Sequence, residues 1–266
     1  MAESLVLIGV GILAGILAGF LGIGGGTIMV PAMVALGLSA VKAVGTSTLA
    51  ILVIALVGSF QNWRMGLLNF NNALLLGLPA IATAFLGTAL ASFFPEYVLL
   101  GVFGLFMLVN IYLVRVKQQV VAGVQSQPLS EGEMASQTPN PIQSRLLIGG
   151  TAGFMAGLFG VGGGVIMVPM QISLLHEEIK TAIQTSLGAI VVTALSALGW
   201  HTMRGNVEAW VGLLLGLGGL VGVQVGTRYL PRLPNRVVTL MFRGVLALFS
   251  VFFFYRAWQS FLVLGR

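Results

Sequence analysis

The chain has 266 residues, of which 57% are hydrophobic, 8% are charged and none is cysteine, and its mean hydropathy is +1.01. Because a soluble domain is about one quarter charged residues, this composition excludes an ordinary soluble domain and predicts an integral membrane protein. The net charge of +6 would suggest nucleic acid as a partner of a soluble protein, but here the basic residues stand mostly at the ends of apolar segments, as membrane orientation requires, so no nucleic-acid partner is expected.

The first apolar segment is broken by glycines. The first four residues lack the basic region and cleavage site of a signal peptide, so residues 5–21 are predicted to be a retained helix. At 1.5 Å per residue this helix is about 25 Å long, close to the hydrocarbon thickness of a bilayer. Residues 28–38 resume the helix, with Pro31 near its start, where the missing N–H costs least. The sequence therefore predicts two helical pieces that meet inside the membrane.

Two similar halves follow from the rest of the chain. Residues 118–144 have the composition of a flexible polar linker, which divides a first transmembrane repeat at 1–117 from a second at 145–266. Further spans of the first half are predicted at 43–60, 73–94 and 98–114. The segments predicted in the second half are 146–159, 166–175, 182–200, 207–230 and 237–255.

The glycine break itself is duplicated. Residues 19–31 match residues 157–169 at nine of thirteen positions, including three consecutive glycines and a proline. The prediction is an all-α integral membrane protein with two homologous four-to-five-helix repeats, each with a Gly-broken first helix. If each break forms a hairpin, the repeats are inverted; if the helix continues, they are parallel. Inversion is the favoured interpretation.

Paired, interrupted helices of this kind are typical of secondary transporters, which bind substrate near the membrane midplane. Glycines free backbone N–H groups at a helix start, where the macrodipole favours an anion. The alternative is that the glycines only let helices pack closely. The predicted substrate-binding residues are Gly24, Gly25, Gly26 and Thr27 in the first break, Gly162, Gly163 and Gly164 in the second, and Thr46, Ser47, Gln184, Thr185 and Ser186 one turn into the following helices.

Few charged residues fall inside the predicted spans. Arg243 lies about two turns into the last span and is a candidate charge contact for the substrate. Arg64 and Arg204 are further candidates, although they stand at span ends, and Arg204 has the i,i+4 spacing of a surface pair with Glu208. His201 is expected to be solvated at an interface. Protons are the candidate coupling ion, but no residue demonstrates such coupling.

Enzymatic interpretations find no support in the sequence. The glycine runs fail the spacing of a dinucleotide motif and have no P-loop lysine, and neither a zinc-protease nor a serine-hydrolase motif occurs. Two distant histidines and no cysteine cannot make a metal cluster. A protein that is not an enzyme, with no cofactor and no metal, is therefore expected. The remaining classes are a secondary transporter, a passive anion channel and a membrane subunit that works with a partner protein.

Several short motifs together resemble the sulfite exporter TauE/SafE family of membrane transporters. They are the duplicated GxGGGxIxVP run, the Gly45-Thr46-Ser47 and Gln184-Thr185-Ser186 triplets, and the Arg64-Met65-Gly66 and Arg204-Gly205-Asn206 turns. The resemblance covers nearly the whole chain outside the linker. It implies transport of a small sulfur-containing anion (sulfite, sulfonate, sulfoacetate or thiosulfate) across a prokaryotic inner membrane, with the anion and the lipid bilayer as partners. The glycine runs and the matching Thr/Ser positions would contribute to the substrate path. Direction, substrate and the presence of a homo-oligomer are left open.

Overall fold

The computed structural model describes residues 2–91, 93–95, 97–98, 100–102, 104–105, 108–109 and 140–264, and this part of the chain forms helices and no strand. The first half contains α1 (Ala2–Leu21), α2 (Gly26–Ala35), α3 (Ala40–Arg64) and α4 (Phe70–Ala91). The second half contains α7 (Pro141–Phe159), α8 (Gly164–Leu174), α9 (Ile179–Met203), α10 (Ala209–Tyr229), the short 3₁₀-helix η1 (Leu230–Arg232) and α11 (Asn235–Leu264). Most of the predicted span 98–114 and residues 118–139 of the predicted linker lie outside the described residues.

Several helix boundaries differ from the sequence prediction, among them the end of α3 and the start of α7. The polar connection predicted at 61–72 shrinks to residues 65–69, because α3 continues to Arg64. At this end of α3 the Gln61 amide donates to the Gln224 carbonyl of α10 at 3.1 Å. Helix α7 begins four residues before the predicted boundary at 145. The Asn140 side chain caps it by accepting from the Ile142 N–H at 3.1 Å, and proline suits the first helical position.

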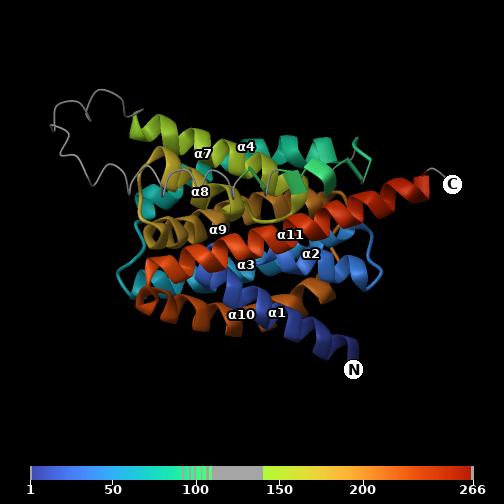
Figure 1. The fold of residues 1–266 in the computed structure, drawn as a ribbon, viewed down its shortest axis with the longest axis horizontal. Helices are drawn as coiled ribbons and strands as arrows, with labels where there is room; N and C mark the ends of the chain where they lie inside the picture. Colours follow the sequence, from blue (N-terminus) through green and yellow to red (C-terminus); the bar gives the residue numbers. More distant parts are fainter. Residues whose placement is uncertain are drawn as a thin grey trace.

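Each glycine break reverses the direction of the chain. Leu7 and Ala14 of α1 pack in one buried cluster with Met29 and Met33 of α2, and the Thr151 hydroxyl of α7 lies 3.3 Å from the Met170 sulfur of α8. Figure 1 shows α1 entering the molecule from the end where both chain termini lie, and α7 entering from the opposite end. We call these ends the terminal face and the linker face. The two hairpins, α1–α2 and α7–α8, thus point toward each other.

Small residues bring the long helices into close contact. Helix α1 packs along α10, and α7 packs along α4. A Cβ atom on Gly15 would lie 2.8 Å from the Gly219 Cα, and one on Gly157 would lie 2.9 Å from the Thr88 nitrogen. Gly216 likewise lets α10 approach α3, since a Cβ atom at this position would lie 3.3 Å from Val53. Such contacts are typical of helix pairs in membranes.

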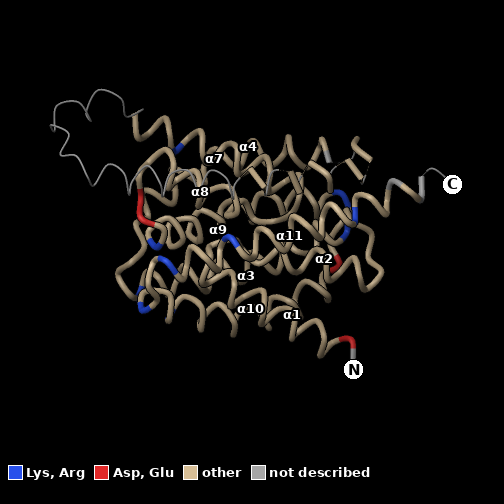
Figure 2. Tube along the Cα trace, in the orientation of Figure 1, with Lys and Arg blue, Asp and Glu red and all other residues tan. Residues whose placement is uncertain are grey.

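Charge is concentrated at the two ends of the molecule. Figure 2 shows basic and acidic residues at the terminal and linker faces, with one basic segment between them, in the first third of α11. Six of the described helices (α1, α3, α4, α9, α10 and α11) are long and apolar enough to cross a membrane. The longest axis of the molecule therefore corresponds to the membrane normal.

Ion pairs between the described residues lie near these faces. Lys42 pairs with Glu208 at 2.6 Å, and Arg145 pairs with Glu177 at 3.2 Å. The predicted pair of Arg204 with Glu208 is wrong, because α9 ends at Met203 and the two residues do not share a helix. Arg204 instead donates to the Thr88 carbonyl at 2.7 Å, at the end of α4.

Candidate anion site at the paired glycine breaks

The two glycine breaks meet in the buried centre of the molecule. A Cβ atom on Gly26 would lie 2.5 Å from the Gly160 carbonyl oxygen and 2.9 Å from the Val161 Cα, and one on Gly164 would overlap the Gly22 carbonyl oxygen. The contact is thus reciprocal between the halves. Only glycine permits so close an approach of two backbones.

Backbone conformation explains why the breaks contain consecutive glycines. Gly24 and Gly25 have φ angles of 79° and 80°, and Gly162 and Gly163 have φ angles of 77° and 76°. L-residues with a side chain rarely adopt these left-handed angles. The glycines therefore turn the chain between the two helices of each hairpin.

Serine hydroxyl groups of each half donate hydrogen bonds to backbone carbonyl groups of the other half. The Ser47 hydroxyl lies 2.8 Å from the Gly160 carbonyl oxygen, and the Ser186 hydroxyl lies 3.1 Å from the Gly22 carbonyl oxygen. The Thr46 hydroxyl accepts from the Glu208 N–H at 3.0 Å. These three predicted substrate contacts have partners within the protein in this conformation.

Backbone N–H groups at the breaks lack such partners. Among the described residues, no hydrogen-bond acceptor faces the five N–H groups of residues 23–27 or the five of residues 161–165. The first hydrogen bonds beyond the breaks run from Ile28 and Met29 to the Gly25 carbonyl, at 3.1 and 3.2 Å, and the second half repeats the pattern at Gly163. Buried N–H groups are almost always paired in native proteins. Two opposed sets of free donors therefore point to a ligand or to water.

Three predicted side-chain contacts remain available. Thr27 is fully buried in the first turn of α2, and its hydroxyl has no hydrogen-bond partner. Gln184 and Thr185, in the first two turns of α9, are also buried, and in the described part of the chain their side chains make no hydrogen bond. These groups add neutral donors to the N–H groups of the breaks.

Two isoleucine side chains pack against the glycine breaks. A Cβ atom on Gly24 would lie 3.3 Å from the Ile51 side chain, and one on Gly162 would lie 3.4 Å from the Ile190 side chain. A groove of about 320 Å³ is lined by Trp63 and other apolar residues of α3, α4 and α9 and does not reach the breaks. Irregular backbone in a membrane must be buried in protein or line a cavity, and here it is buried. In the described part of the chain, the two breaks thus form a closed contact.

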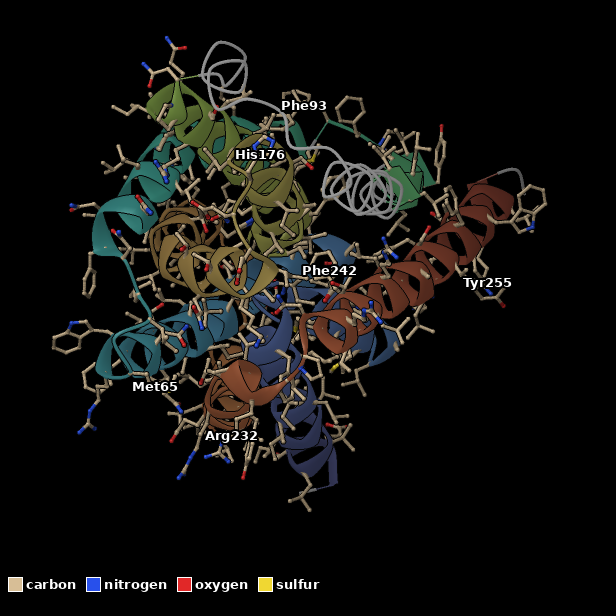
Figure 3. The ribbon with its side chains drawn as sticks, turned by 60° about the vertical axis from the view of Figure 1, so that its left-hand side comes forward. Met65, Phe93, His176, Arg232, Phe242 and Tyr255 are labelled. Carbon is tan, nitrogen blue, oxygen red and sulfur yellow. The ribbon has the colours of Figure 1, made fainter. Side chains whose placement is uncertain are left out.

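Arg243 is a partly buried residue of α11 with unpaired nitrogens. Its neighbours Phe242 and Leu246 pack in the same buried cluster as Ile23 and Val161. In Figure 3, Phe242 lies at the centre of the molecule, whereas Tyr255 lies on the part of α11 that projects outward. The Nε and one terminal nitrogen of Arg243 are buried without a partner, and neither ion pair of the described residues includes it. Two buried guanidinium nitrogens without a partner favour an anion or water beside them.

The other two candidate arginines lie away from the breaks. Arg64 is exposed at the end of α3, with its guanidinium carbon 5.7 Å from the centre of the Phe60 ring. Arg204 is exposed at the end of α9 and bonds to the Thr88 carbonyl. The structure thus leaves Arg64 and Arg204 at opposite faces, whereas the neighbours of Arg243 pack in the core cluster of Ile23 and Val161.

Two buried polar residues were not predicted as functional. His201 is 1% exposed, so the predicted solvated histidine is wrong, and neither ring nitrogen has a hydrogen-bond partner. Asn62 is also 1% exposed with an unpartnered amide. The repeat alignment gave a signal for this pair, since the shift of 139 positions that superposes Thr46 on Thr185 also superposes Asn62 on His201.

Comparison with known proteins places the whole chain in one group. The family model described as sulfite exporter TauE/SafE matches residues 7–253. A probable membrane transporter protein of Methanocaldococcus jannaschii is 23% identical over 263 residues, which cover 93% of this chain and 94% of that protein. One from Xylella fastidiosa is 26% identical over 261 residues, covering 96% and 97%. No solved structure matches the chain.

Proposed function

This chain belongs to the sulfite exporter TauE/SafE family of membrane transporters, and from that premise we propose that it is a secondary transporter of a small sulfur-containing anion, in the sulfite, sulfonate, sulfoacetate or thiosulfate class. It is a multi-pass membrane protein. The observation that carries the proposal is the pair of opposed breaks, each with five N–H groups that have no acceptor in the described part of the chain.

The charge at the centre of the molecule suits a small anion. Helices α2 and α8 both begin at the breaks, at Gly26 and Gly164, and each helix start carries about half a positive charge. Together with the Arg243 guanidinium they supply about two positive charges. A singly or doubly charged oxyanion would balance this charge and accept hydrogen bonds from the N–H groups.

Alternating access would follow from an inverted arrangement of the two halves. The hairpin α1–α2 enters from the terminal face and the hairpin α7–α8 enters from the linker face (Figure 1). We infer that the halves are inverted repeats and that rocking of one against the other opens the breaks to one face at a time. The close packing of the two breaks favours such a carrier over an open anion channel.

Charge asymmetry predicts the orientation in the membrane. The described basic residues near the linker face are Arg64, Arg145, Lys180, Arg228, Arg232 and Arg236, and those near the terminal face are Lys42, Arg204 and Arg256. Six against three favours a cytoplasmic position for the linker face. In the cysteine-free chain, Trp210→Cys at the terminal face should react with an impermeant thiol reagent added to intact cells, and Asn71→Cys at the linker face should not. Labelling of both from the same side would contradict the inverted arrangement, and labelling of Asn71→Cys alone would reverse the orientation.

Transport by the purified protein tests the proposed function directly. Proteoliposomes should take up labelled sulfite or a labelled sulfonate with a rate that saturates, and unlabelled anion inside should accelerate the uptake by counterflow. Empty liposomes are the control. Ohmic single-channel currents would identify a channel instead, and no flux of any anion in the class would contradict the substrate assignment.

A further inference from the structure

Asn62 and His201 occupy equivalent positions near the ends of α3 and α9. Both side chains are buried, and none of their four polar atoms has a hydrogen-bond partner. Because α3 runs from the terminal face to the linker face and α9 runs in the other direction, the two residues lie toward opposite faces. The two halves thus differ here in one chemical property, since imidazole can take up a proton between pH 5 and 8 and an amide cannot.

His201 lies between the terminal face and the second glycine break. The neighbouring Trp200 ring lies 4.4 Å from the Phe85 ring of α4. The imidazole lies beside the backbone of Gly157, although no hydrogen bond forms. Gly157 precedes Gly160 by one helical turn, so His201 stands between the exposed end of α9 and the break.

No carboxylate of the described residues pairs with His201, which is the one buried imidazole among them. Arg204 is the nearest charged group, and Lys42 and Glu208 are paired with each other at this end. Helices α4 and α8 carry no charged residue. The other charged residues of the elements that pack against α9 are Glu3 of α1, Arg64 of α3, Arg145 of α7, which pairs with Glu177, and Arg236, Arg243 and Arg256 of α11.

We propose that His201 binds the proton that couples anion transport to pH, and that this coupling acts at the terminal face only. The proposal rests on the transporter function inferred above. A hydronium ion from the terminal face gives its proton to a ring nitrogen, so that an N–H bond forms, an O–H bond breaks, and water and an imidazolium remain. The proton returns to water in the reverse step.

Coupling to the anion follows from the cost of charge in a membrane. An imidazolium without a counter-charge is expensive in the membrane interior, and an anion at the adjacent break supplies that counter-charge. By linkage, the proton and the anion then raise each other's affinity by the same factor. Transport should therefore become faster as the pH at the terminal face falls.

Substitution of His201 by the residue of the other half tests the proposal. In vesicles of uniform orientation, wild-type flux should rise about tenfold as the pH at the terminal face is lowered from 7 to 4, and His201→Asn should abolish that change. The matched control is His176→Asn. His176 is the second histidine of the chain, is exposed between α8 and α9, and has a φ of 57° that asparagine tolerates (Figure 3). This control should keep the wild-type profile.

The converse substitution keeps the test decisive if His201→Asn folds poorly. Asn62→His should add a dependence of flux on the pH at the linker face, where the wild type has none. An unchanged pH profile in folded His201→Asn would overturn the proposal, as would an Asn62→His variant that responds only at the terminal face. A wild-type protein that transports no anion at any pH would instead contradict the proposed function.

Discussion

Replacement of both Gly25 and Gly163 by valine is expected to abolish anion transport. Both residues have left-handed φ angles, of 80° and 76°, which a β-branched residue adopts only under strain. The new Cβ atoms would lie 3.0 Å from the Ala14 carbonyl oxygen and 2.8 Å from the Ala152 carbonyl oxygen. Each hairpin must then rearrange, and the N–H groups lose their common orientation. The measurement is the initial rate of anion uptake in proteoliposomes.

Two further variants separate the site from the fold. Gly9→Val is the matched control, because a Cβ atom at Gly9 of α1 meets nothing within 4 Å, and it should transport normally. Thr27→Val removes the buried hydroxyl and installs the residue type that Val165 already provides in the other half. Loss of a hydrogen bond to a charged ligand costs about 1.5–3 kcal/mol, so the apparent KM should rise about tenfold or more. Normal transport by the folded double valine variant would refute the site.

Arg243→Gln is expected to lower the transport rate at subsaturating anion by about one to two orders of magnitude. Two guanidinium nitrogens of Arg243 are buried and unpaired, and the adjacent Phe242 packs in the same core cluster as Ile23 and Val161. A charge-assisted hydrogen bond to an anion is worth about 1.5–3 kcal/mol. Glutamine keeps much of the volume and some donors but removes the charge. The measurement is the ratio of maximal rate to KM for sulfite uptake.

Arg236→Gln is the matched control for the Arg243 prediction. Arg236 lies on the same helix but is exposed near the linker face, so the same change of charge should leave the kinetics close to those of the wild type. Arg243→Lys should recover part of the lost activity, since it restores the charge but not the planar donor geometry. Equal losses in Arg236→Gln and Arg243→Gln would show that net charge, rather than contact with the anion, determines the rate.

The breaks could be predicted from the sequence because their signal is local. Three consecutive glycines before a proline-containing helix predict an interrupted helix in any part of a chain. The same run at Gly162 to Gly164 predicts that the second half contains an equivalent break. The direction of the chain after each break was not predictable with certainty. Composition is compatible with either a hairpin or a continued helix, and only the packing of Met29 and Met33 against α1 distinguishes the two.

Burial of the polar residues could not be derived from local pattern. His201 stands near the end of a span, where a solvated side chain is usual, and only the approach of α4 and α7 covers it. The roles of Ser47 and Ser186 also depend on contacts across the two halves. The positions of the arginines could be predicted, since Arg64 and Arg204 stand at span ends in the sequence and are exposed there in the structure, whereas Arg243 stands inside a span and is partly buried.

The reciprocal contact of the hydroxyls with the carbonyls has a consequence for a chain cut in two. Ser47 belongs to the first half and its carbonyl partner at Gly160 to the second, while Ser186 and Gly22 are distributed the other way round. A fragment that contains a single half therefore carries one donor and one acceptor that cannot reach each other. It can complete the centre only by associating with its complement in the antiparallel sense, so separately synthesised fragments should be inactive alone and regain function on co-assembly.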